Sequence, residues 1–131
     1  MKKNDKNTII HPKSHLVAQG FTQTFGVDYD ETYAPIVRMT SLQTICAIAA
    51  RNNWLIHQMD VNVAYLNATL ENLIYMQKPP GYYEDKTKHV FLLKKCLYGL
   101  KQSGREWYKC LSKALYNMGF KESSTDTAVF Y

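Results

Sequence analysis

Asp60 is the residue whose type and position most clearly allow chemistry. It lies in an apolar run at residues 54–61 (WLIHQMDV), and an aromatic residue, Tyr65, follows it by five positions. We predict that this run is a buried strand ending in a carboxylate. Carboxylates at the carboxyl edge of a sheet are common ligands for metals and substrates, since an aspartate buried without a partner is costly. An aspartate in a turn or at a helix cap gives the same pattern, and the residues alone leave both interpretations open.

The cysteines and histidines follow no metal-binding pattern. The three cysteines, Cys46, Cys96 and Cys110, are widely spaced and odd in number, so we predict neither a disulfide framework nor a Cys-x-x-Cys site. The four histidines have no ligand spacing to one another or to the cysteines, as a tetrahedral zinc site would require. We therefore expect no zinc site and a reducing compartment.

A basic segment at residues 78–113 is the second candidate for function. It holds nine Lys and Arg residues against three Asp and Glu residues, a net charge of +6 that exceeds the +5 of the whole chain. Such a segment is expected beside phosphates, although a solvated helix face has the same composition. Its candidate contacts to nucleic acid are Lys94, Lys95 and Arg105.

Local patterns predict the elements that must position these residues. Residues 14–20 (SHLVAQG) predict a strand closed by glycine, and residues 24–35 predict a loop. A helix is predicted over residues 41–52, where a capping box at residues 40–43 precedes apolar residues at helical spacing. The predicted strand at residues 54–61 follows directly.

The second half of the chain predicts two more strands and a second helix. The strands are residues 74–77 and 90–93, with Pro-Pro-Gly and a polar turn at residues 84–88 between them. A capping box at residues 103–106 opens a predicted helix over residues 103–118, which ends at Gly119 in a Schellman stop. Residues 128–131 predict the start of one more strand, so we expect a truncated domain.

Length and composition indicate one globular unit. A chain of 131 residues, 46% hydrophobic and 21% charged, has room for a single domain over residues 1–131, which excludes a two-domain enzyme. No apolar segment suits a signal peptide or a membrane span. We expect no membrane partner and an intracellular location, in the cytoplasm, within a virus-like particle, or in the nucleus.

Beyond these local patterns, the chain resembles the reverse transcriptases of Ty1/copia-type retrotransposons. The family motif around the first catalytic aspartate is matched by residues 58–68 (QMDVNVAYLNA). Five further motifs match in the family's order, at residues 13–23 (KSHLVAQGFTQ), 28–38 (DYDETYAPIVR), 74–82 (IYMQKPPGY), 97–108 (LYGLKQSGREWY) and 119–120 (GF). The resemblance covers nearly the whole chain. It implies an α+β fold, a partial fingers and palm with antiparallel strands and two main helices.

The resemblance also implies a metal site. Asp60 corresponds to the first of two carboxylates that hold two Mg²⁺ ions, and the carbonyl of Val61 is a further metal ligand. In such polymerases the ions activate the primer 3′ hydroxyl and neutralise the phosphoryl transition state, and hard oxygen ligands suit Mg²⁺.

A nucleotide site is implied by the same resemblance. Its residues are Lys13, Val61, Tyr65, Gly99, Lys101 and Gln102. Tyr65 matches the aromatic residue under the incoming sugar that selects deoxynucleotides, and simple core packing is the alternative. Lys13 corresponds to a cation near the triphosphate, while His15 stands where the family usually has arginine.

The turn at residues 99–102 corresponds to the family segment that packs against template and nucleotide. Ser103 and Gly104 replace the more common Ala-Pro of that segment and still provide a helix cap. For Lys101 and Arg105, an exposed helix face is the alternative to a functional contact.

The family's second catalytic motif, Tyr-x-Asp-Asp, occurs nowhere in the chain, and its first fingers strand would precede Met1. We therefore expect a domain truncated at both ends: a piece of an RNA-directed DNA polymerase that is inactive alone. By resemblance its partners are an RNA or DNA template-primer, deoxynucleotides and, if the frame continues, the rest of a retroelement polyprotein. A non-catalytic basic nucleic-acid-binding module and a decayed reading frame are the alternatives.

Overall fold

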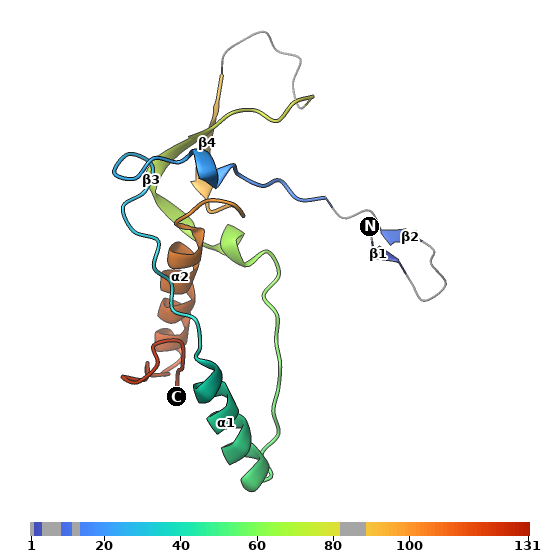
Figure 1. Cartoon of the computed structure of the whole chain (residues 1–131), viewed down its shortest axis with the longest axis vertical. Coiled ribbons are helices and arrows are strands. Elements are labelled where there is room, and N and C mark those ends of the chain that lie inside the picture. Colours follow the sequence, from blue (N-terminus) through green and yellow to red (C-terminus); the bar gives the residue numbers. More distant parts are fainter. Residues whose placement is uncertain (1, 4–8, 12–13, 82–88) are drawn as a thin grey trace.

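The computed structural model describes residues 2–3, 9–11, 14–81 and 89–131 (Figure 1). Its elements are two α-helices, α1 (Met39–Arg51) and α2 (Ser103–Asn117), and two antiparallel strand pairs. The pairs are β1 (Lys2–Lys3) with β2 (Ile9–His11), and β3 (Thr69–Met76) with β4 (Phe91–Lys95). This is the predicted α+β composition. Within the described residues, neither helix has the length and apolar content needed to cross a membrane.

The β3–β4 pair carries the small apolar core. The strand predicted at residues 90–93 is close to β4, whereas the one predicted at residues 74–77 matches only the end of β3, which begins five residues earlier. Ile74 lies opposite Leu93, with a register shift between Thr69 and Ile74. Ala18, Ile74 and Leu100 are buried at the centre, and four half-buried apolar side chains pack around them: Leu70, Met76, Leu93 and Leu97. The core therefore joins the sheet to two segments outside it, residues 14–20 and the turn before α2. In Figure 1, α2 lies beside this sheet, whereas β1 and β2 lie apart from the other elements.

Helix α2 begins at the predicted residue and ends one residue before the predicted end, but its start has a different chemical basis. The predicted capping box is wrong, since no side-chain cap hydrogen bond forms there. Instead the Ser103 hydroxyl donates to the carbonyl of Leu97 at 2.6 Å. The Schellman stop is confirmed: Gly119 has φ +94°, and the N–H of Phe120 donates to the carbonyl of Leu115 at 3.1 Å.

Helix α1 is also confirmed, again without its capping box. The N-cap is Arg38, and no side chain of the predicted box caps the helix. The carboxylate of Asp126 binds the start of the helix instead, because its Oδ2 accepts the N–H of the N-cap residue Arg38 at 2.9 Å. Hydrogen bonds from the side chain of Ser41 and the backbone of Arg38 hold the pKa of Asp126 below its ordinary value. The only buried residue of the helix is Ala49.

Two predicted strands are absent. Residues 14–19 have no regular structure and lead into a short 3-10 helix, Gly20–Thr22. This segment packs against a turn rather than a strand, because the N–H of Ala18 donates to the carbonyl of Tyr98 at 2.8 Å. Residues 54–61 are also without regular structure, since no strand lies beside them among the residues described.

The predicted strand at residues 128–131 is reduced to an isolated bridge between Glu122 and Phe130. The predicted loop at residues 24–35 is confirmed, apart from a single bridge between Phe25 and Tyr29. The polar turn predicted at residues 84–88 lies outside the described residues.

Candidate functional site

Two glycines lie in contact where residues 14–20 meet the turn before α2. A Cβ atom on Gly20 would lie 1.9 Å from the carbonyl oxygen of Gly99, and one on Gly99 would lie 2.1 Å from the carbonyl oxygen of Ala18. Gly99 also has φ +93°, which disfavours any L side chain. The sequence predicted Gly99 as a site residue, and the geometry explains why that position needs glycine. Its partner Gly20 was predicted only as the end of a strand.

Tyr65 lies against this same turn. It belongs to a 3-10 helix, Ala64–Asn67. The residue before this helix, Val63, has a left-handed backbone conformation with φ +47°. The ring centroids of Tyr65 and Tyr98 are 4.5 Å apart, and the ring of His15 meets Tyr98 edge-on at 6.4 Å. Tilted and edge-on contacts between rings of this kind stabilise a fixed arrangement. The structure thus joins Tyr65 to the turn that holds Gly99, Lys101 and Gln102.

Gln102 and Lys101 are both held by the loop at residues 23–29. Gln102 is 5% exposed, and its amide bonds to the side chain of Gln23 and to the carbonyl of Asp28, each at 3.0 Å. Lys101 is exposed, and its ammonium lies 3.2 Å from the hydroxyl of Tyr29. Gln23 and Tyr29 were not predicted as site residues, although both lie within the matched motifs.

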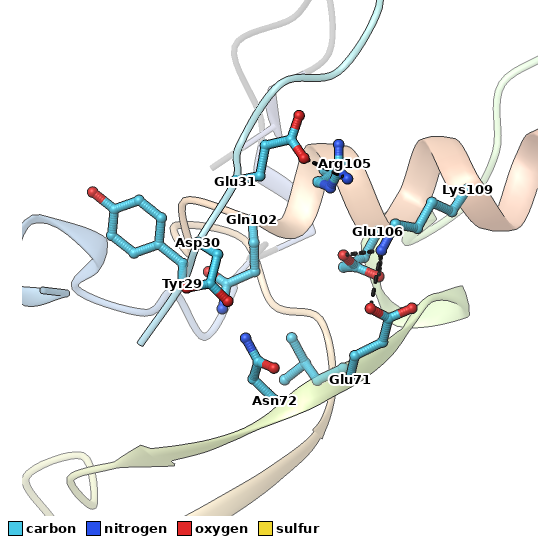
Figure 2. Close-up of a pocket in the computed structure, with 10 residues that line it drawn as sticks. Tyr29, Asp30, Glu31, Glu71, Asn72, Gln102, Arg105, Glu106 and Lys109 are labelled. Atoms are coloured by element: carbon cyan, nitrogen blue, oxygen red, sulfur yellow. Dashed lines mark hydrogen bonds and ion pairs between the residues drawn. The ribbon is translucent and has the colours of Figure 1, made fainter. Parts of the chain in front are cut away.

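Arg105 lines a polar cavity of about 170 Å³ beside the start of α2 (Figure 2). Its guanidinium forms an ion pair with Glu31 at 2.6 Å. On the same helix, the ammonium of Lys109 lies 2.9 Å from Glu106 and 3.1 Å from Glu71. Partial burial acts to lower the pKa of Lys109, but the hydrogen bonds to the two carboxylates outweigh it and raise that pKa. Carboxylates therefore balance both positive charges of this helix face.

Asp60 and Val61 are exposed and lie in the irregular segment at residues 54–61. No three His, Cys, Asp or Glu side chains gather into a metal-binding group anywhere in the described part of the chain. Among the described residues, no group of metal-binding side chains surrounds Asp60, so these residues alone do not form a site for a pair of Mg²⁺ ions. The three cysteines are free thiols.

The remaining predicted residues lie elsewhere. Lys94 and Lys95 are exposed at the end of β4. Lys13 lies outside the described residues. The structure thus brings together four predicted site residues, Tyr65, Gly99, Lys101 and Gln102, and assigns Arg105 to an ion pair.

Comparison with known families gives the class of protein. The chain belongs to the reverse transcriptase (RNA-dependent DNA polymerase) family, whose model matches residues 1–131. More particularly, the similar proteins are polyproteins of Ty1/copia-type retrotransposons.

Three relatives illustrate this similarity. The chain is 41% identical over 130 residues to the retrovirus-related Pol polyprotein from transposon RE1 of Arabidopsis thaliana, covering 98% of the chain and 9% of the relative. It is 37% identical over 132 residues to the retrovirus-related Pol polyprotein from transposon TNT 1-94 of Nicotiana tabacum, covering 100% of the chain and 10% of the relative. It is 33% identical over 124 residues to the transposon Ty1-H Gag-Pol polyprotein of Saccharomyces cerevisiae, covering 90% of the chain and 6% of the relative. The chain therefore spans about a tenth or less of these relatives. No solved structure matches it.

Proposed function

We propose that this chain contributes the fingers and part of the palm of a retrotransposon reverse transcriptase, where it binds template-primer and the incoming deoxynucleotide. The observation that carries the proposal is the contact between Tyr65 and the turn at residues 98–102. These residues are far apart in the sequence, and their rings meet at 4.5 Å. A nucleotide site built from both segments needs this contact.

Tyr65 and three residues of the turn have separate roles in the proposed site. Tyr65 supports the sugar of the incoming deoxynucleotide, and Gly99 allows the backbone to approach closely. Lys101 supplies a positive charge to a phosphate, and Gln102 fixes the turn, because the oxygen and the nitrogen of its buried amide each bond to a protein partner. Lys13 is proposed as a second cation near the triphosphate.

Asp60 is proposed as one carboxylate of a site that other parts of the polyprotein complete. With Val61, it offers too few oxygen ligands for two Mg²⁺ ions among the described residues. We therefore expect the isolated chain to show no primer extension with Mg²⁺ and deoxynucleotides. Template-dependent incorporation above that of a heat-inactivated sample would contradict this expectation.

A non-catalytic nucleic-acid-binding module is the second candidate function. The observation that favours it is the exposure of Lys94 and Lys95 on β4, away from the ion pairs of α2. This candidate needs no carboxylate site. It shares with the first candidate the expectation that the chain binds nucleic acid through its basic segment.

Binding to a single-stranded oligonucleotide at several salt concentrations tests the shared expectation. Each phosphate contact adds about 0.7 to the slope of log K against log salt. Replacing both lysines (K94Q/K95Q) should lower the slope by about 1.4. The control pair R51Q/K121Q removes the same charge from exposed positions outside the basic segment and should change the slope less. Equal slopes for the two pairs would show that only net charge matters and would contradict a defined binding surface.

A further inference from the structure

Gln23 links the loop before Tyr29 to the turn before α2. Its Oε1 accepts the backbone N–H of Lys101 at 2.8 Å, and its Nε2 donates to Oε1 of Gln102 at 3.0 Å. The Nε2 of Gln102 then donates to the carbonyl of Asp28. Because a backbone N–H can only donate and a carbonyl can only accept, these bonds allow one orientation for each amide. The two glutamines therefore form a directed bridge across the site.

Tyr29 holds the other end of Lys101. The ammonium of Lys101 donates to the Tyr29 hydroxyl at 3.2 Å and lies 5.1 Å from the centroid of that ring. The loop that carries Tyr29 is itself fixed by backbone bonds, since the N–H of Gly26 donates to the carbonyl of Tyr29 at 2.9 Å. The backbone and the side chain of Lys101 are thus both held from the same loop.

The groups that hold Lys101 differ in charge from those that hold its neighbours on α2. Carboxylates hold Arg105 and Lys109 and balance their positive charges. A neutral amide and a phenol hold Lys101, so its ammonium is positioned without a carboxylate partner among the described residues. A cation fixed in this way binds an anion with less loss of side-chain freedom than a mobile lysine.

We propose that Gln23 is a positioning residue that, together with Tyr29, fixes Lys101 for contact with a phosphate. The inference rests on the proposed function, because it requires that Lys101 meets a phosphate of the bound ligand. That phosphate can belong to a nucleic-acid backbone or to a deoxynucleoside triphosphate. Gln23 acts only through Lys101 and touches no ligand itself.

A double-mutant cycle in the full chain tests the coupling between Gln23 and Lys101. Affinities for a single-stranded oligodeoxynucleotide of about 15 nucleotides, and separately for a deoxynucleoside triphosphate, are measured against salt. We expect K101Q to weaken oligonucleotide binding about fivefold near 0.1 M salt and to lower the slope by about 0.7. Q23L should reproduce most of this loss in the native chain and add nothing in the K101Q chain. In the K94Q chain, used as the control, Q23L should keep its full effect.

The outcomes separate the inference from the proposed function. A Q23L effect of equal size in the native and K101Q chains, or no effect, overturns the positioning role. If K101Q is silent while K94Q/K95Q weakens binding, the inference fails and the basic surface stands. If K94Q, K95Q and K101Q all leave binding unchanged, the proposed function fails as well. Y29F removes only the hydroxyl, so it replaces Q23L in the cycle if Q23L unfolds the chain. A loss of affinity for only one of the two ligands, the triphosphate or the oligonucleotide, identifies the source of the phosphate.

Discussion

At the scale of single residues, the contact between Gly20 and Gly99 sets the spacing of the candidate site. The two backbones approach so closely that a methyl group on either residue would overlap a carbonyl oxygen. This close contact between the two backbones positions the side chains of the turn, from the ring of Tyr98 to the amide of Gln102.

Substituting Gly99 with alanine should therefore be strongly destabilising. The added Cβ would meet the carbonyl of Ala18 at 2.1 Å, in a backbone conformation at φ +93°. We expect a loss of at least about 2 kcal/mol in the free energy of unfolding, measured by urea denaturation.

Gly104 provides the matched control for this prediction. It lies in the first turn of α2, and its added Cβ would meet only the Cβ of Ala34, at an ordinary contact distance of 3.5 Å. G104A should be neutral or stabilising by up to about 1 kcal/mol. A G99A variant as stable as G104A would contradict the close approach of the two backbones.

The sequence predicted the residues of the turn but not those that hold it. Gly99, Lys101 and Gln102 were found because they lie in one matched motif. Gln23 lies 79 residues from Gln102 and has no local partner that would single it out. Arg105 was predicted as a nucleic-acid contact, but its ion pair with Glu31 depends on the folded path of a distant loop. The roles of Asp60 and Val61 as metal ligands stay predictions.

At the scale of elements, both helices were predicted well because their apolar spacing is a local property. Their capping boxes were wrong because other partners, one local and one distant in the sequence, bind at the two helix starts. The Ser103 hydroxyl bonds to Leu97, and the first turn of α1 meets Asp126. The strand predicted at residues 54–61 failed for the opposite reason. A strand needs a neighbour, and the described residues supply none.

Asp126 should make the stability of α1 depend on pH. Because hydrogen bonds lower its pKa in the folded chain, its carboxylate stabilises the fold above its ordinary pKa of 3.8. This contribution is lost as the pH falls through the lower, folded-state pKa. We expect D126N to lower the melting temperature at pH 7, and the difference from the native chain to shrink below about pH 4.

Thermal melting followed by circular dichroism at several pH values measures this effect. The control is D30N, which removes the same charge from an exposed side chain. A pH-independent difference between D126N and the native chain would mean that the carboxylate charge plays no part in holding α1.

At the scale of the whole molecule, much apolar surface is left uncovered. Trp54, Leu55 and Met59 are 64%, 86% and 90% exposed, and most of the apolar face of α1 is exposed as well. Patches of this kind promote association with other chains. The relatives are roughly ten times longer, which agrees with a segment that functions beside further polypeptide.

The isolated chain should therefore associate as its concentration rises. Burying one large apolar side chain contributes about 1.5–3 kcal/mol, so the double variant L55K/M59K should weaken association without lowering the melting temperature. Sedimentation velocity over a wide concentration range measures this. The control V27K alters another highly exposed apolar residue, in the loop at residues 24–35, and should leave association unchanged. A native chain that stays monomeric throughout would contradict the prediction.

The long spans of the hydrogen bonds around Gln23 and Asp126 have a consequence for synthesis on the ribosome. Gln23 bonds to residues 78 and 79 positions later, and the bond between Arg38 and Asp126 spans 88 positions. The loop that carries Gln23 and the start of helix α1 therefore meet these partners only after residues 101–102 and residue 126, respectively, have emerged from the ribosome. Folding that depends on such distant partners is slow, and the waiting segment is open to proteases and chaperones during translation.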